Sequence, residues 1–181
     1  PNAKYMLQTI LIIIVGIIVL VFVLALLTKK EFSIQADTII DRPKDIVFDY
    51  VKHLRNQENY SKWVMADPNV QLTYTGTDGT VGFKSAWVSA MKNVGVGEQE
   101  ITKIVDGEKY EVEIRFEKPF KGTNQATTTT QAISPTQTKV TTTFYGKSPI
   151  PMNLMTAFIS KMLKKDMDEN ALNLKRVLEN G

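Results

Sequence analysis

The pattern of apolar and charged positions divides the chain near residue 30. From Tyr5 to Thr28 no side chain is charged, and Ile10 to Leu27 is apolar throughout apart from Gly16. As a helix rising about 1.5 Å per residue, residues 5–28 would be roughly 36 Å long, and the hydrocarbon core of a bilayer is about 30 Å thick. The pattern predicts one transmembrane helix, with an anchor at residues 1–30 and one folded domain at residues 31–181.

A cleavable signal peptide is the alternative interpretation of this segment. The apolar run is longer than the roughly 7 to 15 residues of a signal-peptide core, and no small-x-small cleavage pattern precedes Lys29. We therefore expect an uncleaved anchor and a single-pass membrane protein that contacts the membrane through residues 5–28. Lys4 precedes the run, and four basic residues follow it, which favours the cytoplasmic side for the domain: Lys29, Lys30, Arg42 and Lys44. If a strand begins directly after the apolar run, these basic residues belong to a folded domain. Their number is then weaker evidence for the side of the membrane.

Beyond residue 31 the periodicity predicts strands enclosed by helices. A strand at residues 32–40 precedes two short helices at 44–54 and 56–64, and a long helix occupies 152–179. Between them a period of two predicts six strands, at residues 70–75, 81–90, 96–104, 109–116, 126–133 and 139–145. Short turns such as Asp106-Gly107 join these strands, so the strands are antiparallel. The fold class is α+β, with a curved antiparallel sheet of six or seven strands wrapped around a long C-terminal helix.

Alternation within the strands predicts one buried and one wet sheet face. Tyr110, Val112 and Ile114 share one face of their strand, while Glu111, Glu113 and Arg115 share the other. A strongly twisted sheet curls, and one helix fills its concave side incompletely. Several small or polar residues fall at inner positions and suit a cavity wall: Ser85, Gln99, Thr127, Thr129, Gln131 and Thr142. A solid core with locally bonded threonines is the alternative.

The apolar stripe of the last helix completes the predicted pocket. It includes Met155, Phe158, Ile159 and Met162, with Lys161, Lys164 and Lys165 opposite. The pocket residues that we predict are Phe83, Ser85, Trp87, Gln99, Ile114, Phe116, Phe144, Met155, Phe158 and Met162. Ser85 and Gln99 are the two that can orient a ligand headgroup.

Composition removes several classes of function. The chain has no cysteine and one histidine, His53, so thiol nucleophiles, disulfides and most catalytic zinc sites are excluded. A net charge of +3 is too small for a nucleic-acid-binding stripe. If the protein is an enzyme, His53, Tyr110 and Glu98 are its candidate proton-transfer groups. We predict no metal, cofactor or catalytic residue and no nucleic-acid partner, and no oligomeric state is indicated.

The order of elements and several short motifs resemble a known superfamily. The motifs are Arg42-Pro43-Lys44-Asp45-Ile46-Val47-Phe48-Asp49-Tyr50-Val51, Asn56-x-x-x-Tyr60-x-x-Trp63, Asp67-Pro68-Asn69, Val94-Gly95-x-Gly97, Phe116-x-Lys118-Pro119-Phe120, Thr138-Lys139-Val140-Thr141 and Asp166-x-x-x-x-x-x-Asn173-Leu174-Lys175. Together they look like the START-like or polyketide cyclase/dehydrase superfamily (SRPBCC), in a bacterial subgroup with an N-terminal membrane helix. The chain departs from that subgroup at Gln57 and Tyr60, where tryptophans are usual, and at Asn170-Ala171, where Gly-Leu is usual. The resemblance implies a helix-grip fold around an apolar cavity, used by relatives for sterols, phospholipids, quinones, polyketides and plant hormones.

Three functional hypotheses follow. The first is a membrane-tethered module that binds or transfers a hydrophobic small molecule, such as a lipid, a quinone or a polyketide-like compound. The second is a cyclase- or dehydratase-type enzyme acting on an apolar substrate. The third is a partner-binding domain with a vestigial cavity. The scarcity of acid–base groups favours binding over catalysis.

Overall fold

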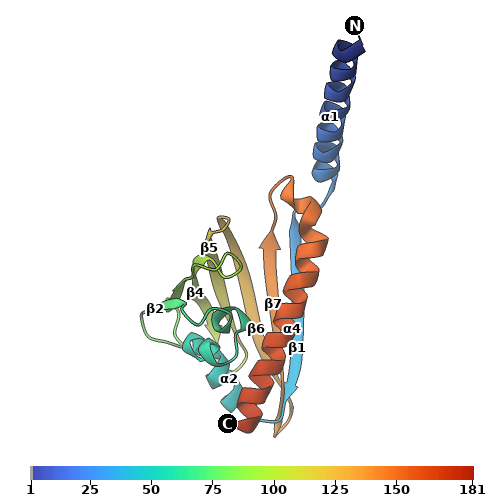
Figure 1. The fold of residues 1–181 in the computed structure, drawn as a ribbon. Helices are drawn as coiled ribbons and strands as arrows, with labels where there is room; N and C mark the ends of the chain where they lie inside the picture. Colours follow the sequence, from blue (N-terminus) through green and yellow to red (C-terminus); the bar gives the residue numbers. More distant parts are fainter. Residues whose placement is uncertain (1) are drawn as a thin grey trace.

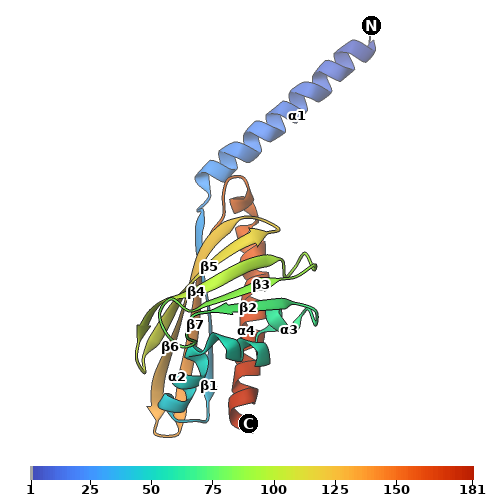
Figure 2. The same cartoon turned by 90° about the vertical axis from the view of Figure 1, so that its left-hand side faces the viewer.

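The N-terminal helix stands apart from the rest of the protein. The computed structural model describes residues 2–181, and its first element is α1 (Asn2–Leu27), a helix of 26 residues. Figures 1 and 2 show that α1 extends away from the sheet. Among its residues only Ala25 is buried. By length and composition α1 is able to cross a membrane.

Residues 31–181 form a sheet that curves around a long helix. After the first strand come three short helical segments, then six strands, a short helical turn and the last helix. In chain order these elements are β1 (Glu31–Ile40), α2 (Lys44–Lys52), η1 (Leu54–Asn59), α3 (Lys62–Met65), β2 (Gln71–Thr75), β3 (Lys84–Val88), β4 (Val96–Val105), β5 (Lys109–Lys118), β6 (Gly122–Ser134), β7 (Gln137–Lys147), η2 (Met152–Met155) and α4 (Thr156–Asn180). We refer to this part of the chain as the body.

The seven strands make one antiparallel sheet in the order β1-β7-β6-β5-β4-β3-β2. β7 therefore returns to pair with β1, and α4 packs on β1 and crosses the concave face (Figure 2). Register shifts at Val96/Gly97 and at Ile101/Lys103 interrupt the β4–β5 ladder, and such bulges increase local twist and bend. The predicted α+β helix-grip architecture is confirmed, with seven strands.

A solid core closes the end of the body farthest from α1. Ile40, Val47, Leu54, Ile101 and Leu178 belong to this core, which brings the end of β1 and helix α2 against the last turns of α4. Arg42 Nε donates a hydrogen bond of 2.6 Å to the carbonyl of Leu178 and fastens the same end. A smaller cluster around Ile34, Ala36 and Met167 lies nearer to α1. The space between sheet and helix is thus filled at one end and looser towards the other.

Candidate ligand cavity

A cavity of about 420 Å³ lies between the concave sheet face and α4. Its floor is the solid core, because Val51, Tyr110 and Leu174 belong to both. Its walls continue towards α1, where Phe32 on β1 and Ile159 on the first turns of α4 take part. This volume lies within the range of roughly 300 to 1,000 Å³ typical of small-molecule sites.

Two glycines make room for the aromatic side chains of this wall. A β-carbon on Gly97 would come within 2.6 Å of the Trp87 ring, and one on Gly146 within 2.3 Å of the Phe32 ring. The Trp87 indole donates a hydrogen bond of 3.2 Å to the carbonyl of Val94. Its ring packs edge-on against the Phe116 ring, with 5.8 Å between the ring centroids. Packing fixes these rings in place, so this part of the wall is preformed.

None of the cavity-lining side chains of the described chain is ionised at neutral pH. The wall contains no Asp, Glu, Lys, Arg or His. Its polar members are neutral: Thr38, Gln57, Tyr60, Ser61, Asn93, Gln99, Tyr110, Asn124, Thr128, Thr142 and Asn170. The remaining members are aliphatic, aromatic or methionine side chains. The cavity is therefore apolar with a few uncharged hydrogen-bonding groups.

Two buried tyrosines form one polar point of this wall. Tyr60 and Tyr110 are both buried, and burial raises the pKa of each phenol. The neighbouring phenol of Tyr110 raises the pKa of Tyr60 further, whereas hydrogen bonding with Thr128 and Tyr60 offsets part of the rise at Tyr110. Both groups remain protonated at neutral pH, so they offer hydroxyl donors and no anion.

Further neutral pairs lie along the wall. Gln99 Nε2 on β4 donates to Gln57 Oε1 on η1 at 2.6 Å. The hydroxyls of Thr128 and Thr142 lie 3.1 Å apart on adjacent strands. These groups can exchange partners with a ligand that carries a hydroxyl, carbonyl or ester.

Five of the ten predicted pocket residues lie on this wall: Trp87, Gln99, Ile114, Phe116 and Phe144. Phe83 and Ser85 do not. Phe83 is fully buried in the solid core, with its ring stacked on Tyr74 at 5.9 Å, and Ser85 is buried beside it on β3 without reaching the cavity. They share the inner face with Trp87, but that end of the strand packs against solid core.

The three residues predicted on the last helix are turned away from the cavity. Met155, Phe158 and Met162 are 50%, 60% and 55% exposed. The wall is made instead by Ile159, Leu163, Met167, Asn170, Ala171 and Leu174. The apolar stripe of α4 is wider than the part that the sheet covers, because its first turns carry apolar residues on two faces.

A one-residue error in phase explains the prediction on β6. The sequence predicts that Thr127, Thr129 and Gln131 point inward, but Thr128 and Thr130 are the buried residues. A strand shifted by one residue exchanges its faces. Consequently the sequence interpretation missed Thr128. The sequence places Tyr110 on the inner face of its strand and among the candidate proton-transfer groups, but not in the predicted pocket, and Tyr60 enters only as part of a motif.

Of the three candidate proton-transfer groups, only Tyr110 reaches the cavity. His53 Nδ1 lies 2.6 Å from the carbonyl of Asp49, outside the cavity wall. Glu98 lies on the convex sheet face, where its carboxylate accepts a hydrogen bond of 2.7 Å from Arg115 Nε. Within residues 2–181 no three His, Cys, Asp or Glu side chains come together to hold a metal ion.

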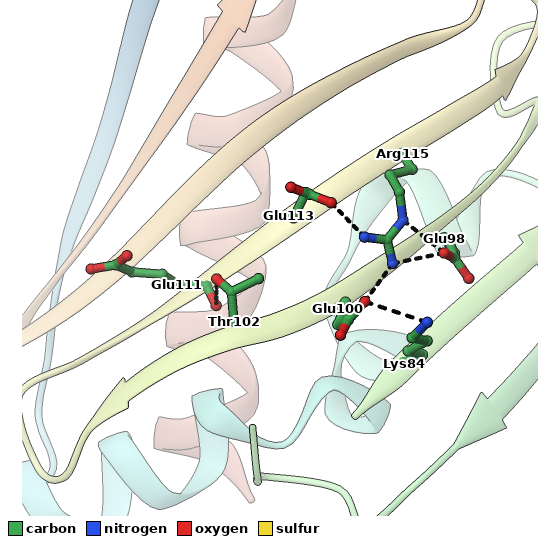
Figure 3. A network of polar contacts seen from close by, with 7 residues as sticks. All are labelled: Lys84, Glu98, Glu100, Thr102, Glu111, Glu113 and Arg115. Carbon is green, nitrogen blue, oxygen red and sulfur yellow. Dashed lines mark hydrogen bonds and ion pairs between the residues drawn. The ribbon is translucent and has the colours of Figure 1, made fainter. Parts of the chain in front are cut away.

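Arg115 is the centre of an ion-pair cluster on that convex face (Figure 3). Besides Glu98 its guanidinium reaches Glu113 at 2.5 Å and Glu100 at 2.6 Å, and Lys84 lies 3.4 Å from Glu100. Hydrogen bonding from Arg115 is the largest cause that lowers the pKa of Glu100, and Glu100 in turn raises the pKa of Arg115. The cluster ties β3, β4 and β5 together on the face opposite the cavity.

Comparison with known proteins supplies the family context. The profile of a family described as polyketide cyclase/dehydrase and lipid transport matches residues 31–179. Protein CV1439 from Chromobacterium violaceum has a similar structure, with a TM-score of 0.58 and 14% identity over 81% of this chain and 96% of that one. A protein from Arthrobacter aurescens gives a TM-score of 0.58 and 20% identity over 83% and 87%.

DynU16, from the dynemicin biosynthetic locus, gives a TM-score of 0.55 and 14% identity over 81% of this chain and 46% of that one. At these identities the likenesses show the fold alone. No curated protein matches the chain in sequence.

Proposed function

The chain belongs to the polyketide cyclase/dehydrase and lipid transport family, of the SRPBCC type, and from this premise we propose that it is a membrane-tethered binding or transfer module for a neutral hydrophobic molecule. The body, residues 31–181, is the ligand-binding domain, and residues 1–30 are its anchor. The observation that carries the proposal is the uncharged wall of the cavity between sheet and α4.

The wall argues for a neutral ligand. Burying an ionised carboxylate or phosphate without a charged partner costs far more than burying a hydroxyl or carbonyl that is hydrogen-bonded. Tyr60, Tyr110 and the Gln57–Gln99 pair can bond such neutral oxygens. A neutral lipid, a quinone or a polyketide-like compound satisfies both the apolar wall and these groups. Of the predicted pocket residues, Trp87, Gln99, Ile114, Phe116 and Phe144 belong to the proposed binding site.

The same wall favours binding over catalysis. Among the described residues that line the wall, the two phenols are the side chains that titrate as weak acids, and burial holds their pKa values above the ordinary range. A general base is most effective when its pKa lies near the working pH. We therefore give a binding role priority over a cyclase or dehydratase activity.

A contact between α1 and the body supports an uncleaved anchor over a signal peptide. Asn153 on η2 is 1% exposed, and its Nδ2 donates to the carbonyls of Ala25 at 2.6 Å and Thr28 at 3.0 Å. Cleavage after α1 would remove the acceptor at Ala25. Tethering also raises the effective concentration of the cavity near the bilayer.

The test is native mass spectrometry of the full-length chain in lipid nanodiscs, followed by organic extraction of the retained molecule. We expect a stoichiometric, uncharged hydrophobic compound. An empty protein that also refuses neutral lipids and quinones would contradict the proposal and favour the partner-binding alternative. A retained fatty acid or other anion would contradict its neutral-ligand part.

A cavity-filling variant sharpens this test. Ala171 lines the cavity on α4, whereas Leu172, the next residue, is exposed. Ala171→Trp should occupy the ligand's space and reduce the retained compound by about fivefold or more, because overfilling a packed site costs about 1 to 3 kcal/mol and each 1.4 kcal/mol is a factor of ten. Leu172→Trp is the matched control and should retain the ligand. Equal retention by both variants would place the ligand elsewhere.

A further inference from the structure

An exposed apolar face lies at the end of the body where α1 joins it. Met152, Leu154, Met155, Phe158 and Met162 are all exposed, and they come from η2 and the first two turns of α4. We call this set the η2–α4 face. On a helix, Met155, Phe158 and Met162 share one side because they are three and four residues apart. Figures 1 and 2 both show the start of α4 at the α1 end of the body.

The height of this face relative to a bilayer is fixed by a direct contact with α1. Asn153, between Met152 and Leu154, donates to the carbonyl of Ala25 in the last turn of α1 and to that of Thr28, the residue after α1. Ser148 N also donates to the Lys30 carbonyl at 2.8 Å. If α1 spans the bilayer, its last turn and the following Lys29 mark the headgroup level. η2 then lies at the same level.

The charges around the face fit an anionic lipid surface. Between Lys147 and Asp166 the chain carries no acidic residue, and its charged residues are Lys161, Lys164 and Lys165. Lys161 and Lys165 are exposed, whereas Lys164 pairs with Asp168. Apolar side chains flanked by free lysines are typical of segments that lie in the lipid–water interface.

We propose that the η2–α4 face is embedded in the interface of the membrane that α1 spans, with Lys161 and Lys165 on anionic headgroups. This inference rests on the proposed tether. It assigns a role to Met155, Phe158 and Met162, which the sequence pattern had placed in the pocket. It also brings the outer end of the cavity to the lipid, because Phe158 faces outward while its neighbour Ile159 lines the cavity.

The chain has no native cysteine, so single cysteines report one position each. We would label Met155→Cys, Phe158→Cys, Leu172→Cys and Val19→Cys with an environment-sensitive dye. The full-length variants are then placed in vesicles of phosphatidylcholine and phosphatidylglycerol that contain nitroxide-labelled lipid. Leu172 is exposed on the same helix, farther from α1, and is the matched control, while Val19 on α1 reports insertion of the anchor.

We expect dyes at positions 155 and 158 to shift to the blue and to be quenched by the nitroxide, as at position 19, while position 172 keeps its aqueous emission. Aqueous emission at 155 and 158 with quenching at 19 overturns the docked face and leaves the tether intact. Aqueous emission at 19 overturns the tether and the inference with it. A ligand retained by native mass spectrometry would still support the binding function in either case.

The lysines have their own test. In the Phe158→Cys background, Lys161→Gln with Lys165→Gln should reduce quenching in vesicles with phosphatidylglycerol and have little effect in phosphatidylcholine alone. Lys164→Gln is the control, because that lysine already pairs with Asp168. If the Phe158→Cys variant with all its lysines is quenched equally in vesicles with and without phosphatidylglycerol, the contact with anionic headgroups is overturned.

Discussion

At the scale of single residues, Asn153 makes the side-chain hydrogen bonds that join the body to the end of α1. Helix ends leave backbone carbonyls without intrahelical partners, and Asn153 Nδ2 donates to two carbonyls at the end of α1, those of Ala25 and Thr28. Asn153→Ala should weaken this local contact by about 1 kcal/mol, the ordinary net contribution of a hydrogen bond, because the exposed Thr28 carbonyl can bind water and the Ala25 carbonyl keeps the Thr28 amide. The readout is faster trypsin cleavage after Lys29 and Lys30 in nanodiscs. Asn180→Ala, at the exposed end of α4, is the control, and an unchanged rate for Asn153→Ala would show that the contact does not hold α1.

The buried phenols predict a dependence of stability on alkaline pH. Tyr60 and Tyr110 have raised pKa values in the folded protein, so the unfolded chain loses these protons first. Their stabilising contribution is complete below the ordinary phenol pKa of about 10 and is lost as the pH rises above it. The free energy of unfolding, measured in denaturant, should fall above about pH 10, and less steeply in Tyr60→Phe.

In Tyr60→Phe the fall of the free energy of unfolding with pH should be reduced and not abolished. Tyr110 remains, and the pKa of Tyr74 is also raised, mainly by desolvation. Tyr145→Phe replaces an exposed ring and should keep the parent slope. If Tyr60→Phe and Tyr145→Phe gave the same alkaline slope, the buried phenols would not be its source.

At the scale of elements, the Arg115 cluster ties β3, β4 and β5 together on the side opposite the cavity. Arg115→Met should lower the free energy of unfolding by about 1 kcal/mol at neutral pH, the upper end for partly exposed ion pairs, and salt should reduce this loss. Glu100 has a lowered pKa, so its contribution is present above the ordinary glutamate pKa of about 4.3 and is lost as the pH falls below it. The stability difference between the parent protein and Arg115→Met should therefore be smaller at acidic pH.

Ligand retention separates the two faces of the sheet. The Arg115→Met variant should keep its ligand, because Arg115 and its partners are not on the cavity wall. Lys139→Met is the stability control, because it removes one ion pair, between Lys139 and Asp37 at 3.5 Å. It should lower the free energy of unfolding by less than Arg115→Met does. A variant that lost its ligand but not its stability would mean that the convex face takes part in binding.

The elements also show where sequence reasoning succeeds and where it stops. Strand β5 alternates strictly, so its inner residues, such as Tyr110 and Val112, could be assigned from the sequence. In β6 the run Thr127–Thr130 has no alternation of polarity, and only the pairing with β7 decides which threonines are buried. The stripe of α4 contains two apolar faces, and the path of the sheet across the helix decides which one lines the cavity. Strand phase and helix rotation are tertiary properties, and the pocket residues depend on both.

At the scale of the whole molecule, the body has a sealed end and an end next to α1. The sealed end combines the solid core with bonds from Arg42 to Leu178 and from Thr138 Oγ1 to the Arg42 carbonyl at 2.8 Å. Phe32 and Ile159, on the opposite part of the cavity wall, belong to the segments that join α1 and η2 to the body. If the body takes its ligand from the bilayer as proposed, this second end is the shortest path for it.

The same arrangement refines the prediction of membrane side. Arg42 lies at the sealed end, far from α1, so it does not belong in a count of charges that flank the membrane segment. Lys29 and Lys30 follow α1 directly, while Lys4 lies in its first turns. Among the residues of this sequence positive charge still favours the body's side, and the positive-inside rule therefore predicts a cytoplasmic body.

A cysteine at Leu172 in the otherwise cysteine-free chain should therefore react with a membrane-impermeant maleimide only after the cells are permeabilised. Exchanging the charges, with Lys29→Gln, Lys30→Gln and added lysines beside Lys4, should shift part of the population to the opposite orientation. Full labelling of the parent variant in intact cells would place the body outside, and the cavity would then exchange ligand with the outer leaflet.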